Sequence, residues 1–134
     1  MDKKHLLVVD DQAEIGAFIK DVAEPLDYDV TVTIDAANFM RFYNQVMPDT
    51  IAMDVFMPNC DGIEIIRGLI QARCSSRILV MSGADEFFLN SVFRLALDQG
   101  LRNVRMMKKP LHLNDLRAFL LEEFHPTTAQ IALH

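Results

Sequence analysis

The chain has 134 residues, a formal net charge of −6 and a pI near 5.0, a size that fits a single domain. The acidic balance argues against direct nucleic-acid binding, which normally needs a basic face, and no apolar run approaches the roughly 20 residues of a membrane span. Hydrophobic residues make up 51% of the sequence, enough for a folded core. The N-terminus lacks a signal-peptide pattern and the two cysteines are too few for a disulfide scaffold, so we expect a cytoplasmic protein.

Short apolar runs alternate with segments of helical periodicity along the whole chain. In chain order, the expected elements are strand 5–10, helix 12–26, strand 28–34, helix 35–46, strand 50–54, helix 62–72, strand 77–81, helix 85–99, strand 103–107 and helix 113–124. Pro25 and Gly100 are expected to end the first and fourth helices, and Asp35 to cap the second. The second strand alternates polar and apolar residues, which is typical of an edge strand.

Five repeats of strand followed by helix predict an α/β fold of the flavodoxin-like, doubly wound type. Its five-stranded parallel sheet would have the strand order 2-1-3-4-5, with helices on both faces. In such a sheet, ligands bind at the carboxyl ends of the strands, where the strand order reverses. The predicted site therefore lies where the first and third strands end.

Polar residues follow four of the predicted strands at this edge. Asp10 ends the first strand and Asp11 follows it, Asp54 ends the third, Ser82 follows the fourth and Lys109 follows the fifth. Three carboxylates in one crevice repel each other, and Mg²⁺ would remove that conflict because it prefers carboxylate oxygens and binds phosphate. A carboxylate can attack phosphorus, and a lysine can offset charge on the transferring oxygens.

These residues and their order resemble the receiver domain of bacterial two-component response regulators, over roughly residues 4–124. The motifs that match are Asp10-Asp11 after Leu-Leu-Val-Val, Asp54 before Val-Phe-Met-Pro, Ser82-Gly83-Ala84 and Lys109-Pro110. The resemblance implies that Asp54 is the phosphoacceptor, that Lys109 contacts the phosphoryl group and that Ser82 hydrogen-bonds to it. It also implies a Mg²⁺ site formed by Asp10, Asp11, Asp54 and the backbone carbonyl of Phe56.

The resemblance further implies a signalling switch, not an enzyme in the metabolic sense, that takes its phosphoryl group from a histidine kinase or a phosphotransfer protein. Residues 1–125 would form the receiver domain, and 126–134 a tail or the start of a linker. Output or dimerisation would use the face formed by helix 85–99, strand 103–107 and helix 113–124. The interval from Ser82 to Lys109 exceeds the family's usual length by roughly one helical turn. That longer form looks like receivers attached to cyclic-di-GMP enzymes, so a C-terminal effector domain of that kind is one expected partner.

Two departures from the family pattern affect the expected switch. Met106 stands where the family usually has an aromatic residue, and Phe56 and Ala84 are apolar where many relatives carry polar side chains. An apolar pair would order the hydrolytic water poorly, which predicts a long-lived phosphorylated form.

Two other functions remain open from the sequence. A phosphatase of the haloacid-dehalogenase type also uses an aspartate nucleophile, but it needs a second aspartate two residues later, where this chain has Phe56. The other alternative is a receiver-like binding module that is never phosphorylated, against which the intact acids and Lys109 argue.

Overall fold

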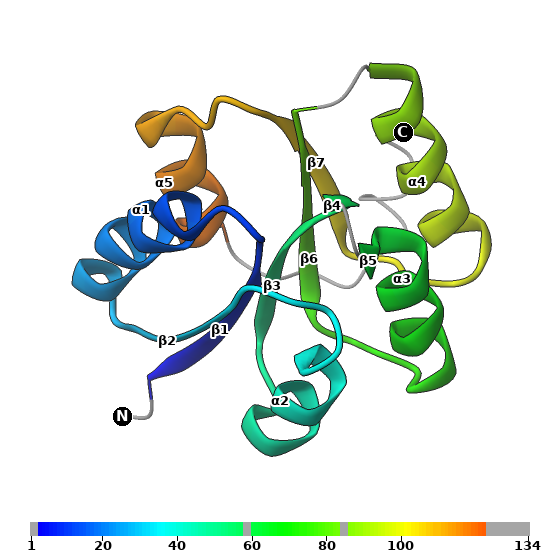
Figure 1. Cartoon of the computed structure of the whole chain (residues 1–134). Helices are drawn as coiled ribbons and strands as arrows, with labels where there is room; N and C mark the ends of the chain where they lie inside the picture. The colour runs from blue at the N-terminus through cyan, green and yellow to red at the C-terminus, as the bar shows by residue number, and fades with distance from the viewer. Residues whose placement is uncertain (1–2, 58–59, 84–85, 123–134) are drawn as a thin grey trace.

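The strands form a parallel sheet with helices on both faces, as shown by a computed structural model that describes residues 3–57, 60–83 and 86–122 (Figure 1). The strands of this sheet are β1 (Lys4–Val9), β2 (Tyr28–Thr33), β3 (Thr50–Asp54), β6 (Arg77–Ser82) and β7 (Val104–Lys108). The helices are α1 (Ala13–Ala23), α2 (Phe39–Val46), α3 (Gly62–Gln71), α4 (Glu86–Asp98) and α5 (Leu113–Leu121). Within the described residues the strands lie in the order β2-β1-β3-β6-β7, so the predicted fold class and strand order are confirmed.

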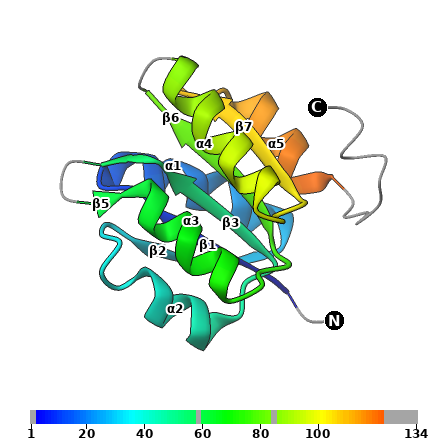
Figure 2. The same cartoon turned by 90° about the vertical axis from the view of Figure 1, so that its right-hand side faces the viewer.

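Two hydrophobic clusters lie on opposite faces of the sheet, because successive side chains of a strand point to opposite sides. Leu7, Ile51 and Ile78 belong to the cluster that packs against α2, α3 and α4. Leu6 and Leu79 belong to the cluster under α1 and α5. Figure 2 shows α2, α3 and α4 in front of the sheet and α1 behind it. The central strands β1, β3 and β6 are apolar on both sides because both of their faces are covered.

Some element ends differ from the sequence-based expectation. Asp35 does not cap α2, which begins at Phe39 with Asn38 in the N-cap position. Oδ1 of Asp35 instead accepts a hydrogen bond from the backbone N–H of Asn38 at 3.0 Å, and this closes a turn before the helix. The first helix ends at Ala23, and Pro25 lies in a short 3₁₀ turn, Glu24–Leu26. Gly100 ends α4 as expected, with a φ of 104° that favours glycine.

A short antiparallel pair, β4 (Phe56–Met57) and β5 (Cys60–Asp61), follows β3 directly and was not predicted. It carries the chain from Asp54 to the start of α3. The tail, 126–134, lies outside the described residues. Among the described helices, none has the length and hydrophobicity needed to cross a membrane.

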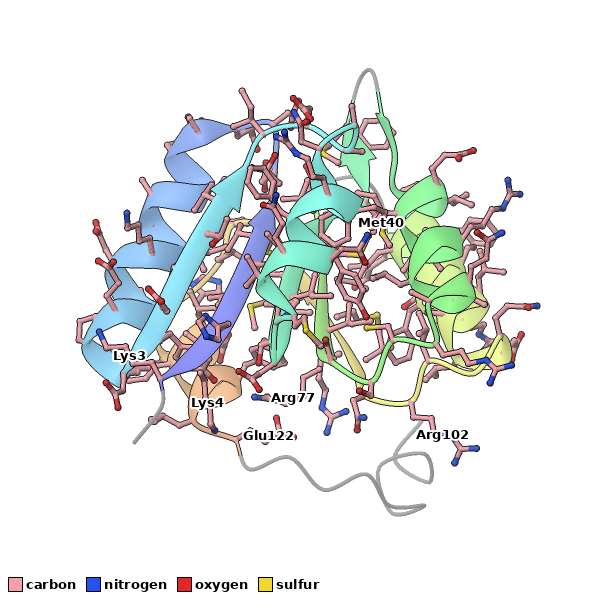
Figure 3. All side chains as sticks on the ribbon, turned by 90° about the horizontal axis from the view of Figure 1, so that it is seen from below. Lys3, Lys4, Met40, Arg77, Arg102 and Glu122 are labelled. Carbon is pink, nitrogen blue, oxygen red and sulfur yellow. The ribbon has the colours of Figure 1, made fainter. Side chains whose placement is uncertain are left out.

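The C-terminal end of α5 is attached to the edge of the sheet where the strands begin, opposite the predicted site. Arg77, at the start of β6, is only 7% exposed and donates a hydrogen bond to the carbonyl of Phe119. Its guanidinium lies over the Phe119 ring and 3.7 Å from Glu122. Arg77 and Glu122 are labelled side by side in the view from below (Figure 3). The hydroxyl of Tyr28 donates to the carbonyl of Leu120 at 2.6 Å. These contacts hold the end of α5 against the first residues of β2 and β6.

Candidate functional site

The ends of four parallel strands bring the predicted site residues to one edge of the sheet. Asp10 follows β1, Asp54 ends β3, Ser82 ends β6 and Lys109 follows β7. The register aligns Asp54 with Met81 on β6, and Ser82 with Lys108 on β7. The site residues of adjacent strands therefore lie level with one another to within one residue.

Three carboxylates form the floor and rim of the site. Asp10 and Asp54 are buried, whereas Asp11 is exposed. Each of the three offers an oxygen atom, and these atoms all lie within 4.8 Å of one another. The backbone N–H of Asp10 donates to the carbonyl of Thr33 at 3.1 Å, and Oδ1 of Asp10 accepts from the backbone N–H of Gln12 at 2.9 Å. The acid after β1 is thus held by backbone contacts on both sides.

Lys109 places its ammonium between the two buried acids. Its Nζ lies 2.7 Å from Oδ2 of Asp10 and 3.3 Å from Oδ2 of Asp54. The contact to Asp10 lacks hydrogen-bond geometry, so that oxygen has an ionic partner but no hydrogen bond. The side chain of Lys109 is 11% exposed, whereas Lys108 is exposed. Of the two adjacent lysines, Lys109 is the one that reaches the acids.

Burial, the largest influence, raises the pKa of Asp54 above its usual value of 3.8. The hydrogen bond from the backbone N–H of Phe56 to Oδ1 at 3.1 Å opposes this, because it favours the ionised form of the carboxyl group. The charge of Asp10 raises the pKa further, and the ammonium of Lys109 lowers it. The net shift is upward, so the burial of this carboxyl group outweighs the backbone hydrogen bond and the ammonium.

The remaining predicted residues flank the acids. Ser82 is fully buried, and its carbonyl accepts from the backbone N–H of Lys109 at 2.9 Å. Phe56 begins β4, and its ring is 62% exposed and packs edge to face on Phe88. The role of the Phe56 backbone carbonyl as a metal ligand stays a prediction. Ala84, the other expected apolar neighbour, lies outside the described residues. Met106 is 43% exposed on β7.

Sequence reasoning missed one residue of this site. Oε1 of Gln12 accepts a hydrogen bond from Nζ of Lys109 at 3.1 Å. Gln12 was assigned only to the start of the first helix, where it occupies the N-cap position of α1. Its position directly after Asp10 and Asp11 could have identified it, because the residue between these acids and α1 also faces the crevice between the strand ends.

Comparisons with known proteins place these residues in a family context. The family model described as the response regulator receiver domain matches residues 6–121. The chain is 35% identical over 88 residues to the alkaline phosphatase synthesis transcriptional regulatory protein PhoP of Bacillus subtilis, covering 66% of this chain and 36% of that protein. It is 34% identical over 119 residues to the transcriptional regulatory protein KdpE of Staphylococcus aureus, covering 88% of this chain and 48% of that protein. The chain thus spans between a third and a half of the length of these two relatives.

Solved structures show the same fold. The receiver domain of the Francisella response regulator 1452 superimposes with a TM-score of 0.72 at 26% sequence identity, covering 87% of this chain and 93% of that chain.

Proposed function

The chain belongs to the response regulator receiver domain family, and from this membership we propose that it is a phosphorylation-dependent signalling switch in which Asp54 accepts the phosphoryl group. One observation carries the proposal: a buried carboxylate at the end of β3 lies beside a lysine ammonium and two further acids. A carboxylate in this setting is a nucleophile for phosphorus.

Each side chain has a separate part in the proposed reaction. Asp54 supplies the attacking oxygen, and Lys109 offsets the negative charge of the transferring phosphoryl oxygens. Ser82, buried at the end of β6, would donate its hydroxyl to the phosphoryl group after transfer. The domain would then act as a switch and not as a metabolic enzyme.

The donor set fits Mg²⁺. Asp10, Asp11 and Asp54 offer carboxylate oxygens within 4.8 Å of one another, and hard divalent cations prefer such ligands. Oδ2 of Asp10 is buried without a hydrogen bond and has the ammonium of Lys109 at 2.7 Å, so this oxygen already sits in a place that suits a cation. We propose that these three side chains, with the backbone carbonyl of Phe56, hold Mg²⁺, which would neutralise part of the charge on the phosphoryl oxygens.

The switch needs several contributors. Phosphorylation adds about −1.5 to −2 charges at one point. Moving a two-state equilibrium from about 1:99 to 99:1 requires roughly 5.5 kcal/mol, whereas one hydrogen bond to a charged group contributes about 1.5–3 kcal/mol. Ser82 alone is therefore insufficient, and Lys109, Mg²⁺ or a partner must supply the rest.

The proposed partners follow from the family. The phosphoryl donor would be a histidine kinase or a phosphotransfer protein in the cytoplasm. Residues 1–125 would be the receiver domain and 126–134 a tail or the start of a linker to an effector, for which a cyclic-di-GMP enzyme is one candidate. The output or dimer face would be α4, β7 and α5, which carries a groove of about 610 Å³. The groove is lined by Asn90, Phe93, Arg94, Leu97, Asp98 and Met106.

Incubation with acetyl phosphate and Mg²⁺, followed by intact mass spectrometry, tests the proposal. The wild-type protein should gain one phosphoryl group, and Asp54→Asn should gain none. A wild-type protein that stays unmodified would indicate a binding module instead. Sustained release of phosphate from small phosphate esters would indicate a phosphatase.

A further inference from the structure

Gln12 connects the acids after β1 with the lysine after β7. Its backbone N–H donates to Oδ1 of Asp10 at 2.9 Å, and its side-chain oxygen accepts from Nζ of Lys109 at 3.1 Å. Although Gln12 occupies the N-cap position of α1, its side chain makes no capping hydrogen bond. The carboxamide therefore does not cap the helix, and its oxygen accepts a hydrogen bond from the lysine instead.

The ammonium of Lys109 has three close oxygen partners. It donates hydrogen bonds to Gln12 at 3.1 Å and to Asp54 at 3.3 Å, and it forms an ion pair with Asp10 at 2.7 Å. A phosphoryl group on Asp54 would draw the ammonium towards its oxygens, which would lengthen the contact with Asp10 or with Gln12. The resting arrangement thus opposes the role that the proposed function gives to this lysine.

Gln12 is the acceptor that can be given up at the smallest cost. Asp10 is fully buried, so water cannot replace the ammonium as a partner of its carboxylate. Gln12 is neutral and exposed, so water can replace the lysine as the partner of its carboxamide. We propose that Gln12 is a positioning residue that holds Lys109 in its resting position, and that this contact breaks as Asp54 takes up the phosphoryl group. The inference rests on the proposed function.

The contact between Gln12 and Lys109 should affect the rate of phosphoryl uptake but not the rate of hydrolysis. During uptake, Oδ2 of Asp54 attacks the phosphorus of an acyl phosphate and forms a new P–O bond. The P–O bond to the leaving carboxylate breaks, and its electron pair departs with that carboxylate. The contact between Gln12 and Lys109 stabilises only the state before transfer, so it slows uptake. Hydrolysis starts after the contact has broken, so its rate does not depend on Gln12.

The variant Gln12→Met tests this, because it keeps the side-chain length and the backbone N–H but removes the acceptor. Phosphoryl uptake from acetyl phosphate with Mg²⁺, followed by intact mass, is expected to be about three- to fivefold faster than in the wild type. Loss of the phosphoryl group after removal of the donor is expected to occur at the wild-type rate. Glu14→Gln, an exposed change in the first turn of α1, is the matched control and should alter neither rate.

A double-mutant comparison separates positioning of the lysine from a general structural effect. In a Lys109→Ala background, Gln12→Met should no longer change the uptake rate. The inference is overturned if uptake by Gln12→Met equals that of the wild type, if both rates change together, or if the effect persists without Lys109. Absence of any uptake by the wild-type protein would instead refute the proposed function itself, so the two failures are distinguishable.

Discussion

Phe56 and Phe88 meet edge to face, with ring centroids 5.6 Å apart and an interplanar angle of 81°. Phe56 also donates its backbone N–H to Oδ1 of Asp54, and Phe88 lies in the first turn of α4. The ring pair therefore links the proposed phosphoacceptor to the helix of the proposed output face. It offers a path for the signal in a chain that has Met106 in place of the family's usual aromatic residue.

We expect Phe56→Leu and Phe88→Leu to be coupled by about 0.5–1.5 kcal/mol in the free energy of unfolding, the range for aromatic pairs. Urea unfolding of the wild type, both single variants and the double variant measures this coupling. Each single variant should also show smaller amide chemical-shift changes in α4 when beryllofluoride and Mg²⁺ are added. Additive stabilities together with unchanged α4 shifts would show that the ring pair transmits nothing.

Arg77→Leu is expected to lower the free energy of unfolding by about 1–3 kcal/mol, because it removes the charged donor to the buried carbonyl of Phe119 and the guanidinium that lies over the Phe119 ring. The carbonyl would keep the backbone N–H of Glu122, at 3.2 Å, as its donor. Glu122→Gln is the matched comparison and should cost less than about 1 kcal/mol, since Glu122 is partly exposed. Both can be measured by urea unfolding. Phosphoryl uptake by either variant should match the wild type, because Arg77 lies at the opposite end of β6 from Ser82. Equal losses of stability in the two variants would contradict the assigned importance of Arg77.

Gly62→Ala should destabilise the protein by about 1–3 kcal/mol, because the new Cβ would lie 2.5 Å from the backbone Cα of Val55. Backbone atoms cannot move aside as a side-chain tip can, and Val55 is the residue after Asp54. Gly83→Ala is the control, since its Cβ would approach Lys109 no closer than 3.8 Å. That change should stay within about 0.5 kcal/mol of the wild type in thermal or urea unfolding. A larger loss from Gly83→Ala than from Gly62→Ala would count against this reading of the packing.

Asp54→Asn is expected to raise the free energy of unfolding at neutral pH when divalent cations are absent. Burial, above all, raises the pKa of Asp54 in the folded protein above 3.8, so its ionised form opposes folding. As the pH falls through the raised pKa, the wild-type carboxyl group is protonated and this disadvantage is lost. The stability difference should therefore shrink on acidification and reach its limit below pH 3.8.

Urea unfolding at several pH values, with a chelator present, measures this difference. Addition of Mg²⁺ at neutral pH should then stabilise the wild type more than Asp54→Asn, because the variant lacks one of the proposed ligands. An asparagine variant that is less stable than the wild type at neutral pH without cations would contradict the prediction.

The order of the elements, the parallel sheet and the edge at which Asp10, Asp54, Ser82 and Lys109 gather could all be predicted from the amino-acid sequence. These follow from local patterns, because continuous apolar runs report strands covered on both faces and right-handed crossovers fix how such strands are arranged. Parallel strands end at one edge, so residues that follow them come together whatever the packing details are.

Which side chains touch at that edge and around it depends on how the elements pack together, and could not be predicted from the sequence. Gln12 and Lys109 are 97 positions apart and meet because β1 and β7 place their following residues in one crevice. The ring contact of Phe56 with Phe88 likewise depends on how the β4–β5 pair lies against α4, which no local period encodes. Asp35 satisfied the local pattern of a helix cap, yet α2 begins later, at Phe39. The physical reason is the same in each case: propensity and periodicity act within a few residues, whereas contacts between distant residues are selected by how completely the whole core packs.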